Sequence, residues 1–240
     1  LTHTFKGHWL VNTTAAAPFT FTTSSTVNFN TPTSPAQTSL SGTTSSTIAF
    51  NAVNINNTSG FSSNLNLSAS GNLTVGATVV FTPGAAAVIS GTGTLTGNGT
   101  VQVTRTAATA DFASQYTISG KTLTNLTVDY AAAGQVLSNF TYGGLKVSGS
   151  ITGAGNTASV GGAFTVTGTF TPTSGTITMN NGSSIVNSGG SLSFSNLTIA
   201  NSATVTTSSS FSVTGTLTNG AGATFSPAGG TITVTGTAWG

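Results

Sequence analysis

The sequence predicts an all-β protein, a parallel β-helix (β-solenoid) of about ten short coils. Apolar and hydroxyl residues alternate along most of the chain, which places one set on each face of a strand. The alternating runs are short and are separated by turns rich in Gly, Asn, Ser or Pro. Similar phrases also recur, since FTVTGTF begins at Phe164 and FSVTGTL at Phe211.

Residues 1–48 are expected to form the N-terminal coils. The alternation of Phe19 with Phe21, and then of Val27 with Phe29, predicts two strands. The Pro-containing stretch 31–37 is expected to be a loop that projects from the body. The chain starts without Met and without a charged-then-apolar signal pattern, so we expect a mature or excised segment.

Residues 49–240 contain a longer repeat. A large apolar residue followed three and five positions later by aliphatic residues begins at Phe50, Leu123 and Phe194, which are 73 and 71 residues apart. A fixed period indicates an array in which stacked units bury a continuous core. Two folds fit: a β-helix with about 20 to 25 residues per coil, or tandem β-sandwich modules of about 70 to 100 residues. The short, close-set strands favour the β-helix, with residues 1–240 as a single array.

The composition excludes several classes of protein. Only 2% of the residues are charged, against roughly 25% in an ordinary soluble domain. The four Lys and Arg residues are too few and too scattered to neutralise a nucleic-acid backbone. No apolar run approaches the ~20 residues of a membrane-spanning helix, so no transmembrane segment is expected. The absence of Cys does not decide the compartment.

Three phrases carry a resemblance to known proteins: FNAVNINNTSG, FTVTGTFTPTSGTITM and FSNLTIANSATVTTSSSFSVTGTLTNGAG. They resemble the Gly/Thr/Asn-rich β-strand repeats of secreted bacterial surface proteins, of the filamentous-haemagglutinin and autotransporter-passenger types. The resemblance covers most of the chain after residue 48, and HTFKGHW near its start. It implies a right-handed parallel β-helix that forms extracellular fibres, adhesins or matrix, and it implies no catalytic residue.

The segment 101–146 differs from the rest of the chain. It holds five of the six charged residues and all three tyrosines. Tyrosine and charged side chains are typical of recognition surfaces, so this segment is the candidate contact patch. The alternative is an irregular loop whose charges are solvated or paired with each other. The patch consists of Arg105, Asp111, Tyr116, Lys121, Asp129, Tyr130, Tyr142 and Lys146.

Catalytic, cofactor and metal sites are not expected. A carboxylate pair could come only from Asp111 and Asp129, which are 18 residues apart in a chain without Glu. His3 and His8 are five residues apart and would face opposite sides of one strand. The sequence therefore predicts that the protein is not an enzyme.

The function favoured by these observations is that of an extracellular, cell-surface structural or adhesive protein, which forms a fibre, sheath or stalk. Its expected partners are other copies of itself, joined head to tail, and glycans or cell-surface ligands. One alternative is a carbohydrate-binding solenoid module, which needs an exposed row of tyrosines and is excluded if the tyrosines are buried. Another is a β-sandwich filament subunit that donates a strand to its neighbour.

Overall fold

The protein is a parallel β-solenoid of about ten turns, which confirms the predicted fold class. The computed structural model describes residues 1–11, 20–21, 24–31, 38–42, 47–107, 109–236 and 238–239. Phe19 and most of the predicted loop 31–37 lie outside the described residues. The chain divides into two compact units: unit 1 is Leu1–Arg105 with Ala113–Leu126, and unit 2 is Thr106–Phe112 with Thr127–Gly240.

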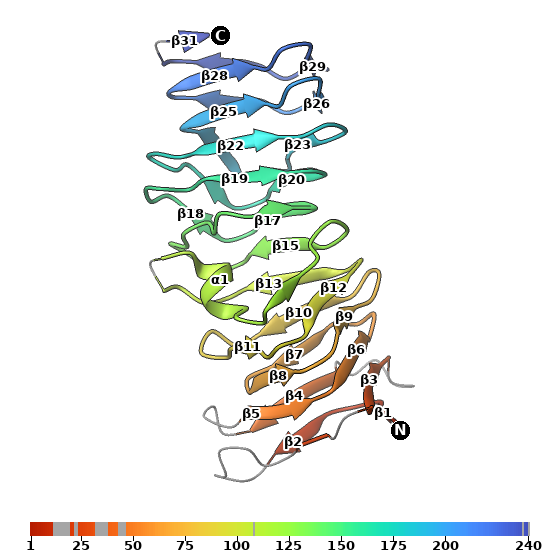
Figure 1. Ribbon diagram of the computed structural model, residues 1–240. Helices are drawn as coiled ribbons and strands as arrows, with labels where there is room; N and C mark the ends of the chain where they lie inside the picture. Colours follow the sequence, from red (N-terminus) through yellow and green to blue (C-terminus); the bar gives the residue numbers. More distant parts are fainter. Residues whose placement is uncertain are drawn as a thin grey trace. The chain divides into compact units, whose positions relative to one another are not determined.

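Unit 1 stacks its strands in three ladders, in each of which every strand pairs with the next (Figure 1). The first ladder is β1 (Thr2–Phe5), β3 (Thr26–Asn30), β6 (Ala52–Asn56), β9 (Leu73–Val75), β12 (Thr94–Gly97) and β14 (Gly120–Lys121). The second is β2 (Trp9–Val11), β4 (Thr38–Gly42), β7 (Phe61–Ser63), β10 (Val80–Pro83) and β13 (Thr100–Val103). The third is β5 (Thr47–Phe50), β8 (Asn66–Ala69) and β11 (Ile89–Ser90).

The strands of unit 2 follow the same plan and also form three ladders. The first is β15 (Thr127–Tyr130), β17 (Gly144–Val147), β20 (Ala163–Val166), β23 (Ser184–Asn187), β26 (Thr204–Thr207) and β29 (Thr224–Pro227). The second is β16 (Thr141–Tyr142), β19 (Ala158–Val160), β22 (Thr176–Met179), β25 (Asn196–Ile199), β28 (Thr216–Asn219) and β31 (Ala238–Trp239). The third is β18 (Ser150–Ile151), β21 (Thr169–Phe170), β24 (Ser191–Phe194), β27 (Phe211–Val213) and β30 (Ile232–Val234). A short helix, α1 (Asp111–Gln115), precedes them.

The register of the ladders stacks like residues on like. In unit 2, Leu145 pairs with Phe164 and Phe164 with Ile185, and all three side chains are fully buried. Their outward neighbours on the same strands are half-exposed, as the alternation in the sequence predicts. From β17 to β29 successive partners are 19 to 22 residues apart, close to the expected coil length. Burial of each large apolar side chain stabilises the fold by about 1.5 to 3 kcal/mol.

The neighbouring strands run parallel in both units, which excludes the tandem β-sandwich alternative because sandwich sheets are antiparallel. This also excludes the donated-strand filament subunit, because that alternative required a β-sandwich.

Glycine allows tight corners between successive coils. A Cβ at Gly175, whose φ is +105°, would lie 2.3 Å from the carbonyl oxygen of Asn156 on the preceding coil.

The phrases that recur in the sequence do not mark equivalent places in the coil. FTVTGTF carries β20 and FSVTGTL carries β27, and these strands belong to different ladders of unit 2. The two later members of the 72-residue pattern likewise lead into β15 and β25, which also lie in different ladders. All the faces use the same alternation, so similarity between segments does not predict their register.

Candidate functional site

The segment 101–146 holds the irregular part of the chain. It contains β13, α1 and the short strands β14 and β16, and the boundary between the units falls within α1. The predicted patch residues therefore belong to different units. Arg105, Tyr116 and Lys121 are in unit 1, and Asp111, Asp129, Tyr130, Tyr142 and Lys146 are in unit 2.

In unit 1, Arg105 binds backbone rather than facing a ligand. Its Nε and Nη2 donate to the carbonyl oxygens of Ala85 and Ala86, at 3.3 and 3.1 Å. Its Nη1 donates to the carbonyl oxygen of Ser114 at 3.3 Å. The guanidinium thus joins the turn after β10 to α1 and satisfies carbonyl groups that no ladder pairs.

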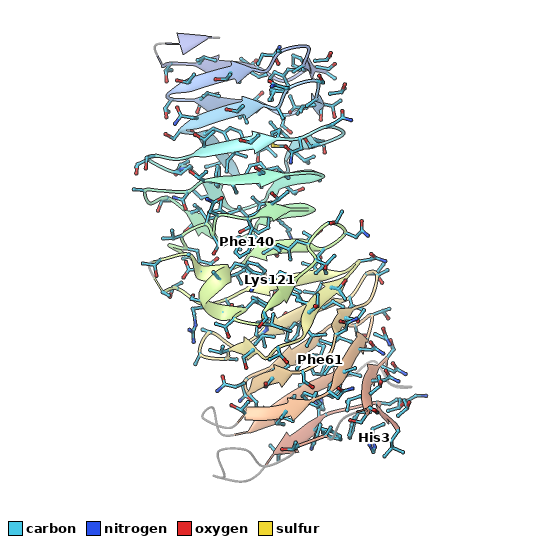
Figure 2. All side chains as sticks on the ribbon, in the orientation of Figure 1. His3, Phe61, Lys121 and Phe140 are labelled. Atoms are coloured by element: carbon cyan, nitrogen blue, oxygen red, sulfur yellow. The ribbon has the colours of Figure 1, made fainter. Side chains whose placement is uncertain are left out.

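Tyr116 and Lys121 also bond to backbone. The Tyr116 ring is fully buried, its hydroxyl donates to the carbonyl oxygen of Gln102 at 2.8 Å, and burial raises its pKa. Lys121, labelled in Figure 2, donates from Nζ to the carbonyl oxygen of Ile118 at 2.5 Å. Partial burial lowers the pKa of this amine.

Gln115 bonds to the backbone that follows β10 and to the backbone that follows β13, and the sequence analysis did not predict this role. Its side chain is fully buried. The Oε1 atom accepts hydrogen bonds from the backbone N–H groups of Thr104 and Arg105, at 2.8 and 3.2 Å. The Nε2 atom donates to the carbonyl oxygen of Gly84 at 3.0 Å. One buried amide therefore satisfies backbone groups of two segments, the residues after β10 and the residues after β13.

In unit 2, the buried carboxylate of Asp111 holds two stretches of backbone together. One oxygen accepts the N–H of Ala107, and the other accepts the N–H of Val136 at 2.6 Å. The N–H of Asp111 itself donates to the carbonyl oxygen of Val136 at 3.0 Å. Hydrogen bonds to an ionised acceptor are stronger than neutral ones, so this residue ties residues 131–140 to the start of α1.

Tyr130 and Tyr142 form a buried pair that bonds to the backbone of Ser138. Their hydroxyl groups lie 2.9 Å apart, the N–H of Ser138 donates to the Tyr130 hydroxyl at 2.9 Å, and the Tyr142 hydroxyl donates to the carbonyl oxygen of Ser138 at 2.7 Å. Phe140, labelled in Figure 2, packs edge-to-face on Phe112, with ring centroids 5.4 Å apart. Burial raises the pKa of Tyr130 to about 12, and burial together with Tyr130 raises that of Tyr142.

The stretch 131–140 has no strand of its own, and side chains replace the missing ladder. Five of its backbone N–H groups donate to side-chain oxygens, whereas the N–H of Gln135 donates to the carbonyl oxygen of Ser150. The pairs are Ala132 to Gln135 (3.0 Å), Gly134 to Ser150 (2.8 Å), Val136 to Asp111 (2.6 Å), Leu137 to Asn156 (2.7 Å) and Ser138 to Tyr130 (2.9 Å). We call residues 131–140 with these partners the side-chain-supported stretch.

Asp129 and Lys146 form an ion pair on neighbouring strands, with 3.4 Å between Nζ and Oδ2. Asp129 is buried, and its other oxygen accepts from the N–H and the hydroxyl of Ser148, at 3.2 and 2.8 Å. For this pair the alternative interpretation, in which the charges of the segment pair with each other, is confirmed.

The structure corrects the predicted contact patch. Five of its eight side chains are buried and hydrogen-bonded, and a buried side chain is not available to a ligand: Asp111, Tyr116, Asp129, Tyr130 and Tyr142. The carbohydrate-binding alternative required an exposed row of tyrosines, and all three tyrosines are buried. The accessible members, Arg105, Lys121 and Lys146, each bind backbone or Asp129.

The sequence analysis did not predict three buried amide side chains that accept hydrogen bonds from backbone N–H groups: Gln115, Gln135 and Asn156. A signal was present, because three of the four glutamines in the chain lie between residues 102 and 135. Within the described ranges no cluster of three His, Cys, Asp or Glu side chains could hold a metal ion. No helix in the described part of the chain has the length and apolar character to cross a membrane.

Comparison with known proteins adds no relative. No protein-family model matches the chain. Neither the curated proteins nor the solved structures gave a match. The class of this protein is therefore the one that its fold defines, a parallel β-solenoid with a buried polar network in its irregular segment.

Proposed function

We propose that this solenoid is an extracellular structural protein of the adhesin-like class, which builds a fibre, sheath or stalk at the cell surface. The observation that carries the proposal is the unbroken stacking in unit 2 from β17 to β29. There each coil bonds to the next through backbone, and buried Phe164, Phe194 and Phe211 form a continuous column with centroids 5.4 and 5.3 Å apart. A stack of this kind resists bending and pulling because the load is spread over many hydrogen bonds.

The exterior suits a protein that must work outside the cell. Beyond Tyr130 the sequence contains one charged side chain, Lys146, and the outward positions of the strands are mainly Thr, Ser and Asn. A surface with so little charge changes little with pH or salt. It also lacks the self-repulsion that keeps molecules apart, which favours association into larger structures.

Electron microscopy of the purified, undenatured protein tests the proposal. We expect filaments or long stacks in which strands repeat every ~4.8 Å along the axis. The same particles should persist when the salt is raised from low to molar concentration. Discrete rods under all conditions would refute the self-assembling structural role. Antibodies against the protein should label intact source cells without permeabilisation, and label confined to the interior would refute the cell-surface location.

A further inference from the structure

The second ladder of unit 2 carries a regular array of threonines on its outward face. On β22, β25 and β28, which lie one above another in Figure 1, the outward positions read Thr-x-Thr, Asn-x-Thr and Thr-x-Thr. Thr178 pairs with Thr198 and Thr198 with Thr218, so the later positions form one column. Ser159 of β19 continues this column. We call the six outward residues of the three strands the threonine face: Thr176, Thr178, Asn196, Thr198, Thr216 and Thr218.

The geometry of the ladder fixes the spacing of this face. Neighbouring strands lie ~4.8 Å apart, and two residues along a parallel strand span about 6.6 Å. Threonine is β-branched and has few rotamers on a strand, so its hydroxyl and methyl groups hold their positions. Ile177, Leu197 and Leu217 lie between the outward residues and are at most 2% exposed. The half-exposed threonines therefore form a rigid grid on a packed support.

The outward residues of the other two ladders of unit 2 are arranged differently. On the first ladder, the outward residues that pair across β17, β20 and β23 are Lys146, Thr165 and Val186, which differ in charge and polarity. On the third ladder, the Ser212 hydroxyl donates to the Ser193 hydroxyl at 2.8 Å, so these two groups bond to each other. The grid is therefore a property of one face and does not follow from outward exposure alone.

The threonine face has hydrogen-bonding groups available to a neutral partner. Within the described residues, the hydroxyls of Thr178, Thr198 and Thr218 make no hydrogen bond to another group of the protein. The six residues of the face include no charged side chain and no aromatic ring, so the face has no ionic group to pair with a phosphate or a carboxylate. An uncharged partner with hydrogen-bonding groups at a regular spacing complements it.

Ice is a partner of this kind. Its surface is uncharged, its lattice excludes ions, and its water oxygens repeat at distances close to the two spacings of the grid. Each threonine hydroxyl can take the place of a lattice water, and each methyl group can lie in a gap between waters. A rigid grid also loses little conformational freedom when it binds.

We propose that the threonine face binds ice. The face lies along the side of the coils rather than at either end of the chain, and residues 109–236 are described without a gap. This activity goes beyond the proposed structural function and does not depend on it, since a single molecule carries the whole face.

Two substitutions in the face test the inference, and each has a control on the first ladder. Thr198→Tyr raises a ring above the centre of the grid, and Thr178→Lys adds a charge that ice excludes. The controls, Thr165→Tyr and Thr165→Lys, place the same side chains at a half-exposed outward position of β20. Circular dichroism first establishes that all four variants fold. Thermal hysteresis and inhibition of ice recrystallisation then measure binding to ice.

We expect the unmodified protein and both controls to inhibit ice growth, and to be enriched in ice that grows slowly from a dilute solution. Thr198→Tyr and Thr178→Lys should each need at least about tenfold more protein for the same inhibition, because the new side chain also separates its neighbours from the ice.

The remaining outcomes overturn the inference in separable ways. An unmodified protein that leaves ice growth unchanged would refute it, while filaments in electron microscopy would still support the proposed structural function. Inhibition that survives in both Thr198→Tyr and Thr178→Lys would place ice binding on another surface. Binding to an insoluble neutral polysaccharide instead of ice, with loss of binding in Thr198→Tyr, would identify the face as a glycan-binding surface.

Discussion

The regular coils of unit 2 and its side-chain-supported stretch satisfy their backbone in opposite ways. In the coils from β17 to β28, ladder hydrogen bonds pair the backbone, and the outward side chains are mainly those of Thr, Ser and Asn. In residues 131–140, buried side chains such as Asp111 and Tyr130 accept the N–H groups. On the outside of the coils we expect any β-forming polar residue to serve, whereas the irregular stretch needs particular atoms inside.

The same comparison explains where the charged residues and tyrosines of unit 2 lie. A buried N–H without a partner costs about 1 to 3 kcal/mol, so a chain that leaves its ladder must supply acceptors. Asp111, Tyr130 and Asn156 supply acceptors for the backbone of residues 131–140.

In a regular coil, loss of inward volume should dominate. Phe164→Ala removes a fully buried ring that lies 5.0 Å from Phe170 and 5.4 Å from Phe194, measured between centroids. We expect it to lower the free energy of unfolding by about 3 to 5 kcal/mol. Urea unfolding followed by circular dichroism measures this loss. Thr165→Ala, on the outward face of the same strand, should cost less than about 1 kcal/mol. Equal losses for both variants would mean that inward and outward side chains stabilise the coil equally.

In the side-chain-supported stretch, an isosteric polar change should be damaging. Asp111→Asn keeps the shape but replaces one of two accepting oxygens with a donor, so the N–H of Ala107 or Val136 loses its partner. We expect a loss of about 2 to 3 kcal/mol. Hydrogen exchange should accelerate at residues 131–140 before it does in β20 or β23.

A second isosteric change serves as the control for Asp111→Asn. Thr198→Val alters a half-exposed outward hydroxyl in β25 and should change stability by less than about 0.5 kcal/mol. Similar losses in Asp111→Asn and Thr198→Val would mean that the two regions depend on their polar groups equally.

Alkaline pH should unfold the protein through its buried tyrosines. Burial raises the pKa of Tyr130 to about 12, whereas a tyrosine in the unfolded chain titrates near 10. The folded state thus holds the proton more tightly. The stability it provides is complete below about pH 10 and is lost as the pH rises towards 12, by about 1.4 kcal/mol per pH unit. Tyr142, whose pKa is also raised, adds to the loss.

Urea midpoints between about pH 9 and pH 12 measure this dependence. Tyr130→Phe should flatten the slope, because one of the coupled groups no longer titrates. Tyrosinate absorbance that develops near pH 10 in a protein that stays folded would show that the pair is open to solvent.

The sequence predicted the fold class because its signal is repeated in every coil. The alternation around Phe164 and Phe211, the turns and the near absence of charge all favour one architecture. The register was not predictable from the same signal, since β20 and β27 carry nearly the same phrase in different ladders. Local alternation records which face is inside, and the coil lengths decide which strands pair.

The tyrosines and aspartates of segment 101–146 were expected at the surface, but they are buried. Composition reports which residue types are present, and it does not report whether the backbone beside them has a ladder partner. Tyr142 and Asp111 are buried because Ser138 and Val136 need hydrogen-bond partners there. The concentration of glutamines in the same segment is the feature that favoured an internal role.

The smallest effect concerns the ion pair of Asp129 with Lys146. Lys146 is the exposed partner on a regular strand, with 36% of its side chain accessible, and Asp129 keeps its hydrogen bonds to Ser148 when the lysine is removed. Lys146→Met should therefore cost no more than about 1 kcal/mol, and the difference from the unmodified protein should shrink in molar salt. A loss that is larger than this and insensitive to salt would place Lys146 among the groups that the fold needs. The outward face of β17 would then contain a side chain that the fold requires, as the side-chain-supported stretch does.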